Sequence, residues 1–393
     1  MNLSRCYRVA DLQKLARRRL PSPVYQYLEG GSDDEATLLR NTAAFQDYEL
    51  LPSQLRDVSN VDTSATVLGE KLAMPLILSP TGMSRLFHHE AEPGVARAAE
   101  KHAVYYSLST LATTTIEAIG ELIASPKMFQ IYIFRDRGLT ADFVERCKAS
   151  NFQALCLTVD TPVTGNRERD HRTGFSMPPR FTAASLLSYA LHPHWSLNLL
   201  RHRGFRMANV EHRVGGFKNR AVSLFEYVGE QFDPSISWTD FAWLAERWDG
   251  PLVIKGIQSA ADARRAVELG ATAIMISNHG GRQLDGTPAP VDCISAIAEA
   301  VGGRAEIICD GGIRRGTHIL KALALGATAC SIGRPYLYGL AAGGQQGVER
   351  VLQLLREEMC RDMQLLGCRT LDELRASHVS RRAASLQAAD NLL

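Results

Sequence analysis

The stretch Ala273–Gly286, AIMISNHGGRQLDG, joins an apolar run to a polar, glycine-rich loop. Its first part, AIMI, is typical of a buried parallel strand. The loop places the imidazole of His279 and the guanidinium of Arg282 three residues apart, with two glycines between them that let a ligand approach the backbone. A strand end that presents a base beside an anion-binding group predicts a functional site. The alternative is a polar loop with a hydrogen-bonded histidine.

Seven further apolar runs are similar to this one and alternate with helical patterns. In chain order the eight runs are Met74–Gly82, Val104–Thr110, Lys127–Ile133, Ala154–Asp160, Pro251–Ile257, Ala273–Asn278, Glu306–Gly311 and Ala329–Arg334. Such an alternation is typical of parallel strands covered on both faces. Eight βα units predict an α/β fold, a closed (β/α)8 barrel. The alternative is an open doubly wound sheet, but residues 79–82 (SPTG) lack its glycine-rich fingerprint.

The repeat occupies part of a chain that we expect to be a single domain over residues 1–393. The barrel is expected at 71–370, after an N-terminal helical extension at 1–70 that includes a helix at Arg8–Arg19. Barrels of this class often exceed the usual domain size, so the length of the chain does not require a second domain.

A long insertion at residues 161–250 separates the fourth and fifth runs and closes with a helical pattern at Trp238–Trp248. Its middle part, Arg180–Arg220, carries seven Lys and Arg residues against one acid, with apolar side chains among them. A basic and apolar segment of this kind can lie on a membrane surface. We interpret 177–220 as either an active-site lid or a membrane-surface segment, with an oligomer contact as a further alternative.

The composition excludes several classes of protein. A formal net charge of +2 lacks the basic excess of a nucleic-acid binder, so no nucleic-acid partner is expected. The eight cysteines form no C-x-x-C pair, so no metal site is expected. Free cysteines in apolar runs and an N-terminus without a signal-peptide pattern favour a cytoplasmic protein. No apolar run approaches the roughly 18 residues of a membrane-spanning helix.

Polar side chains gather where the eight runs end, on the face where barrel enzymes build their sites. They are Thr81, Ser109, Gln130 with Tyr132, Thr158 with Asp160, Lys255, Ser277 with His279, Asp310, and Gly333 with Arg334. The last two runs lead into the basic glycine loops Asp310–Gly316 and Gly333–Pro335, where barrels commonly bind phosphate. A phosphate-bearing cofactor is therefore expected. Pyridoxal phosphate and flavin mononucleotide (FMN) both fit, because Lys255 could form a Schiff base or face a flavin.

The loop Ser277–Gln283, SNHGGRQ, closely resembles the active-site signature of the FMN-dependent L-2-hydroxy-acid dehydrogenases and oxidases. That family includes glycolate oxidase, L-lactate dehydrogenase and mandelate dehydrogenase. The resemblance runs from about Tyr7 to Ser377 and includes the motifs Val24–Tyr27, Pro80–Gly82, Gln130–Tyr132, Thr158–Pro162, Arg167–Asp170, Lys255–Gly256 and Asp310–Arg314. It implies a (β/α)8 barrel with FMN as the cofactor, and it removes pyridoxal phosphate.

The resemblance also implies a role for each matching residue. The implied catalytic residues are His279 as the general base, Asp160 as the partner of its imidazolium, and Tyr132 as the contact of the substrate oxygen. The implied substrate-binding residues are Tyr27, Arg167, Arg282, Tyr132, Leu111 and Gly82, with the arginines on the substrate carboxylate. The implied cofactor-binding residues are Pro80, Thr81, Gly82, Ser109, Gln130, Thr158, Lys255, Ser277, Asp310, Gly311, Gly312, Arg314, Gly333 and Arg334.

The implied reaction is the oxidation of an L-2-hydroxy acid to a 2-keto acid. His279 would remove either the α-proton, leaving a carbanion-like species, or the hydroxyl proton as a hydride moves to the flavin. We expect L-lactate as the substrate. The alternative is (S)-mandelate or another aryl or long-chain acid, because Leu111 and Gly82 stand where glycolate oxidases carry Trp and often Ala.

The insertion favours quinone or cytochrome over O2 as the electron acceptor, and peripheral association with the inner face of the cytoplasmic membrane. The family resemblance implies a homo-tetramer. A hydroxy-acid oxidase that uses O2 remains an alternative enzyme. A barrel without catalytic activity is the alternative outside enzymes, and flavin absorbance of the purified protein would distinguish it.

Overall fold

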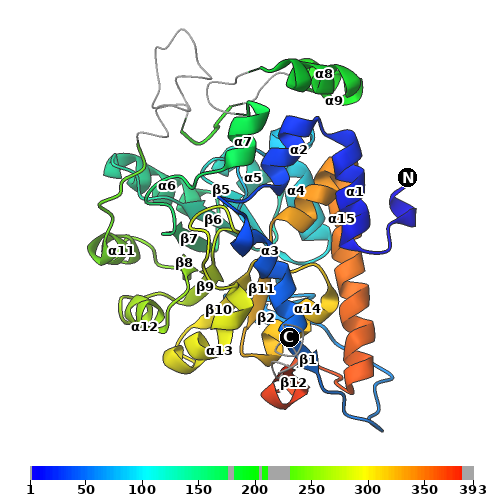
Figure 1. The fold of residues 1–393 in the computed structure, drawn as a ribbon. Coiled ribbons are helices and arrows are strands. Elements are labelled where there is room, and N and C mark those ends of the chain that lie inside the picture. The colour runs from blue at the N-terminus through cyan, green and yellow to red at the C-terminus, as the bar shows by residue number, and fades with distance from the viewer. Residues whose placement is uncertain (1, 176–180, 203–205, 211–230, 383–393) are drawn as a thin grey trace, which may run out of the picture.

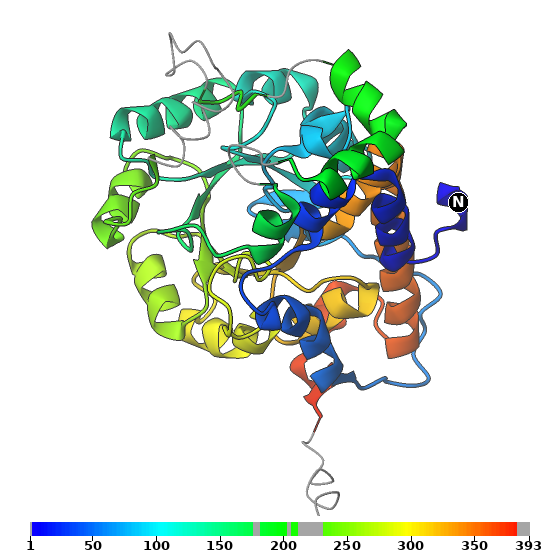
Figure 2. The same ribbon diagram turned by 45° about the horizontal axis from the view of Figure 1, so that its top comes forward.

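Eight parallel strands form one closed barrel in the order β10–β11–β4–β5–β6–β7–β8–β9 (Figure 2). The computed structural model describes residues 2–175, 181–202, 206–210 and 231–382. The strands are β4 (Leu76–Leu78), β5 (Tyr105–Ser109), β6 (Lys127–Ile131), β7 (Ala154–Thr158), β8 (Leu252–Ile257), β9 (Ala273–Ser277), β10 (Glu306–Asp310) and β11 (Ala329–Ile332). Each lies within one of the eight predicted runs. The closed order confirms the (β/α)8 prediction and excludes the open sheet.

A helix follows each barrel strand and covers its outer face (Figures 1 and 2). These helices are α4 (Ala91–Lys101), α5 (Ile116–Leu122), α6 (Arg137–Ala149), α11 (Trp238–Ala245), α12 (Ala260–Glu268), α13 (Pro290–Val301), α14 (Gly316–Ala324) and α15 (Arg334–Leu366). Side-chain caps set several of their starts: Thr115, Asp136 and Ser259 each accept a hydrogen bond from a backbone N–H in the first turn. The predicted helix at Trp238–Trp248 is α11.

The N-terminal extension packs beside the barrel through α1 (Val9–Arg19), α2 (Ser22–Glu29) and α3 (Ala36–Ala43). The helix predicted at Arg8–Arg19 is therefore present as α1, and its buried Leu12, Leu15 and Ala16 lie on the side that contacts α15. Short 3-10 turns complete this part at η1 (Leu3–Arg5) and η2 (Ala44–Asp47). The assignment of residues 1–393 to a single domain stays a prediction.

Two antiparallel ribbons were not predicted from the sequence. One pairs β1 (Tyr48–Leu50) with β12 (Val379–Arg381), and the 3-10 turns η5 (Leu371–Glu373) and η6 (Ala376–His378) lead into it. The other is the hairpin of β2 (Ala65–Val67) and β3 (Glu70–Leu72). Val67, Leu68 and Leu72 of this hairpin are buried with Tyr105, Ala154, Ala273 and Ala329, the first residues of four barrel strands. The hairpin therefore closes the N-terminal end of the barrel and leaves the C-terminal end for a site.

The described part of the insertion consists of α7 (Glu168–Thr173), α8 (Ala183–Leu191) and α9 (Pro193–Arg201). Of the segment predicted at 177–220, residues 177–180, 203–205 and 211–220 lie outside the described residues. Helices α8 and α9 form a hairpin beside α2, at the top of Figure 1. Trp195 attaches the hairpin to the barrel because its indole N–H donates to the carbonyl of Leu86 (2.7 Å), in the 3-10 turn η3 (Ser84–Leu86). Within the described ranges, no helix combines the length and the apolar character needed to span a bilayer.

Packing between α1 and α15 should contribute strongly to stability, because Leu12 is fully buried. We expect Leu12→Ala to lower the free energy of unfolding by about 2–5 kcal/mol, through lost apolar contact and the cavity it leaves. Chemical denaturation of the purified protein measures this change. The exposed Lys14 of the same helix provides the control: Lys14→Ala should change stability by less than about 0.5 kcal/mol. Equal effects of the two substitutions would contradict the role of this contact.

Candidate active site

The C-terminal ends of the strands and the loops after them surround a cavity of about 530 Å³. This volume is typical of small-molecule and cofactor sites. Most of the predicted site residues line it: Tyr27, Pro80, Thr81, Gly82, Ser109, Leu111, Tyr132, Arg167, Lys255, His279, Arg282, Asp310, Gly311, Gly312, Arg314, Gly333 and Arg334. The other four, Gln130, Thr158, Asp160 and Ser277, lie in or directly after barrel strands β6, β7 and β9. Segments far apart in the sequence thus meet at one end of the barrel.

His279 and Asp160 form a hydrogen-bonded pair at the cavity. Nδ1 of His279 lies 3.0 Å from Oδ1 of Asp160. Burial alone would raise the pKa of Asp160, but the neighbouring His279 and Lys255 hold it below its ordinary value. The carboxylate therefore stays charged and can stabilise an imidazolium, as in other carboxylate–histidine pairs. His279 itself adopts a left-handed backbone conformation (φ 56°), which is uncommon outside glycine and typical of functional sites.

Two arginines and a tyrosine gather at one side of the same cavity. The guanidinium of Arg282 lies 4.9 Å from the ring centre of Tyr27, and that of Arg167 lies 5.7 Å from it. Asp170 pairs with Arg167 (Nε to Oδ2, 3.3 Å). Desolvation and the nearby Arg167 lower the pKa of Arg282 to about 10. Arg282 and Arg167 together carry two positive charges and Asp170 only one negative charge. The excess positive charge on this side of the cavity suits a substrate carboxylate.

One of the two glycines after His279 has a different role from the one expected. A Cβ on Gly281 would lie 2.5 Å from the backbone nitrogen of Leu38 in α3, and one on Gly280 would lie 2.7 Å from Nη1 of Arg334. Both glycines have positive φ angles. The protein itself therefore fills the space above Gly281, which permits a tight turn packed against α3, whereas Gly280 lines the cavity.

Arg334 binds backbone carbonyls in this structure. Its Nε, Nη1 and Nη2 donate to the carbonyls of Leu28, Gly280 and Gly30, at 2.8–3.1 Å. Arg282 also donates to Gly30 and to the carbonyl of Tyr27. The carbonyls of Tyr27, Leu28 and Gly30 belong to the C-terminal end of α2, where a helix favours cations. Arg334 lines the cavity, and its contact with phosphate stays a prediction.

Lys255 and Asp310 form a buried ion pair below the cavity (Nζ to Oδ2, 3.2 Å). Ser79 and Ser277 donate to the two carboxylate oxygens of Asp310, at 2.5 and 2.8 Å. Burial would raise the pKa of Asp310, but Lys255 and these hydroxyl groups hold it below its ordinary value. Burial would likewise lower the pKa of Lys255, but Asp310 and Asp160 outweigh it and raise that pKa. The pair is therefore charged, and it fixes an ammonium group at the cavity wall.

The cavity has the features that FMN requires. The side-chain nitrogen of Gln130 and the hydroxyl of Thr158 are buried and have no hydrogen-bond partner among the described residues, which costs about 1–3 kcal/mol each unless a ligand supplies one. Space beside Gly333 is open, since a Cβ there would have no neighbour closer than 3.7 Å. Helix α15 begins directly after Gly333, and helix N-termini bind phosphate. The positively charged Arg314 lines the same end of the cavity.

Gly82 and Leu111 form one wall of the cavity together. A Cβ on Gly82 would lie 3.0 Å from Cβ of Leu111, so the leucine occupies the space that the glycine leaves. Tyr132 lies on another part of the wall, with its ring centre 5.1 Å from that of Phe232. Burial and the negative charge of Asp160 raise the pKa of Tyr132 well above its ordinary value. Its hydroxyl therefore stays protonated and is available as a hydrogen-bond donor.

Several residues that shape this site were missed by the sequence analysis. Ser79 and Ser331 are hydrogen-bonded to each other beneath the cavity, and Ser79 stands in the SPTG stretch where it could have been noticed. Met207 and Phe232 line the cavity from the insertion, where no motif marks them. Only the folded chain returns these two side chains to the barrel mouth.

A (β/α)8 barrel with a carboxylate–histidine pair, two arginines and a flavin-sized cavity defines a class of flavin-dependent oxidoreductases. The comparisons agree: residues 16–381 match the family described as FMN-dependent dehydrogenase. The L-lactate oxidase of Nostoc sp. is 43% identical over 371 residues, covering 93% of this chain and 96% of the relative. The L-lactate dehydrogenase of Haemophilus influenzae is 40% identical over 370 residues, covering 93% and 96%.

A crystal structure described as the monotopic membrane protein (S)-mandelate dehydrogenase superimposes with a TM-score of 0.92, at 36% identity. The match covers 96% of this chain and 100% of that one. The chain therefore belongs to the FMN-dependent dehydrogenase family. It is an enzyme that uses FMN to oxidise a 2-hydroxy acid. This confirms the family, the cofactor and the class of reaction predicted from the sequence.

The Lys255–Asp310 pair should make stability depend on acid. We expect Asp310→Asn to lower the free energy of unfolding at neutral pH by about 3–5 kcal/mol, because it leaves a buried cation with less compensation. The pKa of Asp310 is lower in the folded protein than its ordinary value of about 4, so its contribution is full above that pH and falls as the pH drops through the folded value. Denaturation between about pH 3 and 7 measures both effects. The exposed Asp249 is the control, and a similar loss in Asp249→Asn would contradict the assignment.

Proposed function

We propose that this enzyme oxidises L-lactate to pyruvate, with His279 as the general base. The convergence of His279, Arg282, Arg167 and Tyr27 on one cavity carries the proposal. The names of two relatives, an L-lactate oxidase and an L-lactate dehydrogenase, support the choice of substrate. A small 2-hydroxy acid would place its carboxylate on the two guanidinium groups and its reacting carbon near the imidazole.

Each residue around the imidazole of His279 has a separate role in the proposed reaction. His279 takes a proton from the substrate, either from the α-carbon or from the hydroxyl group, and the two routes use the same side chains. Asp160 stabilises the imidazolium that results. Tyr132 donates a hydrogen bond to the substrate oxygen, and Arg167, Arg282 and Tyr27 hold the carboxylate so that the reacting atoms stay close. Leu111 and Gly82 shape the space for the substrate side chain.

FMN, when bound, supplies an acceptor for the two electrons that leave the substrate. The polar groups that would hold its ring system are Pro80, Thr81, Gly82, Ser109, Gln130, Thr158 and Ser277. Lys255 would place a positive charge beside the ring, where negative charge develops during reduction. The groups that would hold the ribityl chain and phosphate are Asp310, Gly311, Gly312, Arg314, Gly333 and Arg334.

Replacement of the base tests this assignment directly. We expect His279→Gln to slow anaerobic bleaching of the flavin by L-lactate about 10²–10⁴-fold, because no other group takes the proton. The variant should still bind FMN, since the cofactor contacts lie elsewhere. Stopped-flow absorbance measures the rate, and the yellow colour measures cofactor retention. His102→Gln, at the end of α4, is the control. Near-normal bleaching in His279→Gln would contradict the role of the imidazole.

A second substrate class is favoured by one specific observation. Leu111 lines the cavity, and a leucine there leaves room that a tryptophan at the same position would fill. This room, together with the likeness to an (S)-mandelate dehydrogenase, supports an aryl or long-chain L-2-hydroxy acid as the alternative substrate. A bleaching screen with L-lactate, (S)-mandelate, glycolate and longer acids distinguishes these candidates.

The part of the cavity wall formed by Gly82 and Leu111 should therefore limit the size of the substrate side chain. We expect Leu111→Trp to lower kcat/KM for (S)-mandelate relative to glycolate by about tenfold or more, because the larger ring reduces the cavity. Steady-state kinetics with both acids measure this ratio. Leu365→Trp, an exposed leucine at the far end of α15, is the matched control and should leave the ratio unchanged. An unchanged ratio in Leu111→Trp would remove this residue from the specificity wall.

For the electron acceptor we propose a quinone or a cytochrome rather than O2, with the protein peripheral on the inner face of the cytoplasmic membrane. Exposed apolar side chains on α8 and α9 support this, as does the description of one neighbour as a monotopic membrane protein. We also propose a homo-tetramer, on family membership alone. Turnover with O2, a soluble quinone and cytochrome c in parallel tests the acceptor, and light scattering of the holoprotein tests the assembly. Fast turnover with O2 would favour the oxidase alternative.

A further inference from the structure

A second cavity, of about 420 Å³, lies between the α8–α9 hairpin and the side of the barrel. Its wall comes from the end of α1, from the segment after η3, from both helices of the hairpin and from α15. Phe87 lines both this cavity and the active-site cavity, so the two are neighbours. None of the catalytic or cofactor residues named above lines the second cavity.

The wall of this second cavity is cationic. It contains Arg18, Arg19 and Arg85 together with three histidines, and its described lining contains no Asp or Glu. Burial lowers the pKa of His88 to about 4, so this histidine is neutral at pH 7, while the three arginines are positively charged. Arg19 uses one donor on the carbonyl of Ala342. No ion pair is recorded for Arg18 within the part of the chain that the structure describes.

Arg85 is the buried member of this set, at 8% exposure. Its Nη2 donates to the carbonyls of Asn198 and His202 at the end of α9, and among the described residues its Nε and Nη1 have no hydrogen-bond partner. Burial lowers the pKa of this guanidinium, so the site holds a charged group at a cost that a bound anion would offset. A buried cation with free donors at a cavity wall is the geometry of an anion site.

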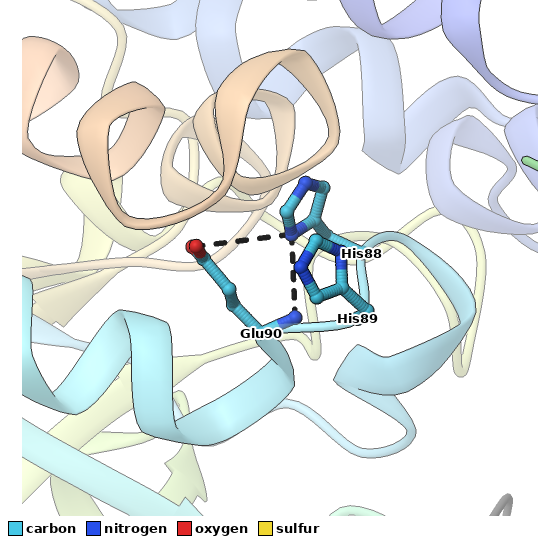
Figure 3. Close-up of side chains that lie close together, drawn as sticks. All are labelled: His88, His89 and Glu90. Atoms are coloured by element: carbon cyan, nitrogen blue, oxygen red, sulfur yellow. Dashed lines mark hydrogen bonds and ion pairs between the residues drawn. The ribbon is translucent and has the colours of Figure 1, made fainter. Parts of the chain in front are cut away.

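Among the described residues the nearby carboxylates make no hydrogen bond with Arg85, although the negative charge of Glu92 offsets part of the cost of burying its guanidinium. Glu92 accepts hydrogen bonds from Ser84, Thr113 and Thr114. Glu90 lies beside His88, as Figure 3 shows, and its carboxylate accepts from the backbone N–H of Gln345 in α15. That N–H follows the bend of α15 at Gly343–Gly344, so Glu90 serves the start of the second helical segment. Both acids are occupied by other donors.

The rim of the cavity is apolar. Leu191, 69% exposed, lines the cavity and also belongs to a set of exposed apolar side chains on and beside the hairpin. The others are Phe181, Leu186, Leu187, Leu197 and Leu200. A set of exposed leucines at one end of a soluble barrel marks an interaction surface. Here that surface borders directly on a cationic cavity.

We propose that this cavity binds the phosphate of an anionic phospholipid, whose acyl chains lie against the exposed leucines of α8 and α9. The phosphate offers acceptor oxygens to the free donors of Arg85 and a negative charge to Arg18 and Arg19. Free phosphate shares this chemistry, but the apolar rim favours a ligand that also carries hydrocarbon. The inference rests on the membrane association proposed above, and it adds a headgroup preference and a defined position. Because Phe87 is shared, a lipid held here would place the active-site cavity next to the membrane surface.

Vesicle binding of the FMN-loaded protein tests the proposal. The partition coefficient is measured by sedimentation with phosphatidylcholine vesicles, with and without phosphatidylglycerol, and their ratio is the preference for anionic lipid. We expect Arg85→Gln and Arg18→Gln each to reduce this ratio about fivefold, the contribution of one arginine near an anionic surface. Arg264→Gln, an exposed arginine on α12, should leave the ratio unchanged. Leu187→Ser should weaken binding to both kinds of vesicle and keep the ratio.

Two sets of results would overturn the proposal. An unchanged ratio in Arg85→Gln and Arg18→Gln, or an equal fall in Arg264→Gln, would mean that the attraction is not localised at the cavity. A thermal shift with inorganic phosphate, without any preference among vesicles, would assign the cavity to free phosphate. Arg85 also anchors α9 to the barrel, so Arg85→Gln could unfold the protein. In that case the exposed Arg18 still tests the proposal, because Arg18→Gln removes a charge of the cavity without removing a structural contact among the described residues. Anaerobic bleaching by L-lactate is followed in every variant, so a failure of the catalytic proposal is recognised separately.

Discussion

The arrangement at the barrel mouth depends on the buried ion pair between Lys255 and Asp310. Through Ser79, Ser277 and Ser331 this pair connects residues in or directly after five neighbouring strands, from β8 through β11 to β4. Ser277 accepts from Lys255 and from the backbone N–H of His279, so the same network fixes the strained backbone of the base. A buried pair is weak evidence of net stability, but loss of one partner is expensive. The network thus couples the position of His279 to the integrity of the barrel.

A second constraint holds the N-terminal extension over this site. The carbonyls at the end of α2 accept from Arg282, in the loop after β9, and from Arg334, the first residue of α15. Tyr27 stands at the same helix end and reaches the cavity. The arginine predicted to bind substrate therefore also positions the tyrosine predicted to assist it. Because one guanidinium performs both tasks, substitution of Arg282 would alter the geometry of Tyr27 as well as the charge of the site.

The sequence predicted what local patterns determine. Eight apolar runs predicted the eight barrel strands, since parallel strands buried on both faces are continuous in hydrophobicity. The motifs at the ends of these runs predicted most of the residues that line the cavity. The sequence did not predict the β2–β3 hairpin, whose three-residue strands are too short for a period to be read. It also predicted that a ligand approaches both glycines after His279, whereas the space above Gly281 is occupied by α3. Packing between segments more than 200 residues apart leaves no mark in either local pattern.

The insertion illustrates how one segment can serve two surfaces. On its inner side, Trp195 and the carbonyls at the end of α9 attach the hairpin to η3 through Leu86 and Arg85. On its outer side, leucines remain exposed, although burying each of them would be worth about 1.5–3 kcal/mol. A soluble helix pair with no further partner would have no reason to keep that exposure. Rigid attachment on one face and exposed apolar area on the other suit the membrane-facing role proposed for this hairpin, because the barrel mouth would then keep a fixed distance from the bilayer.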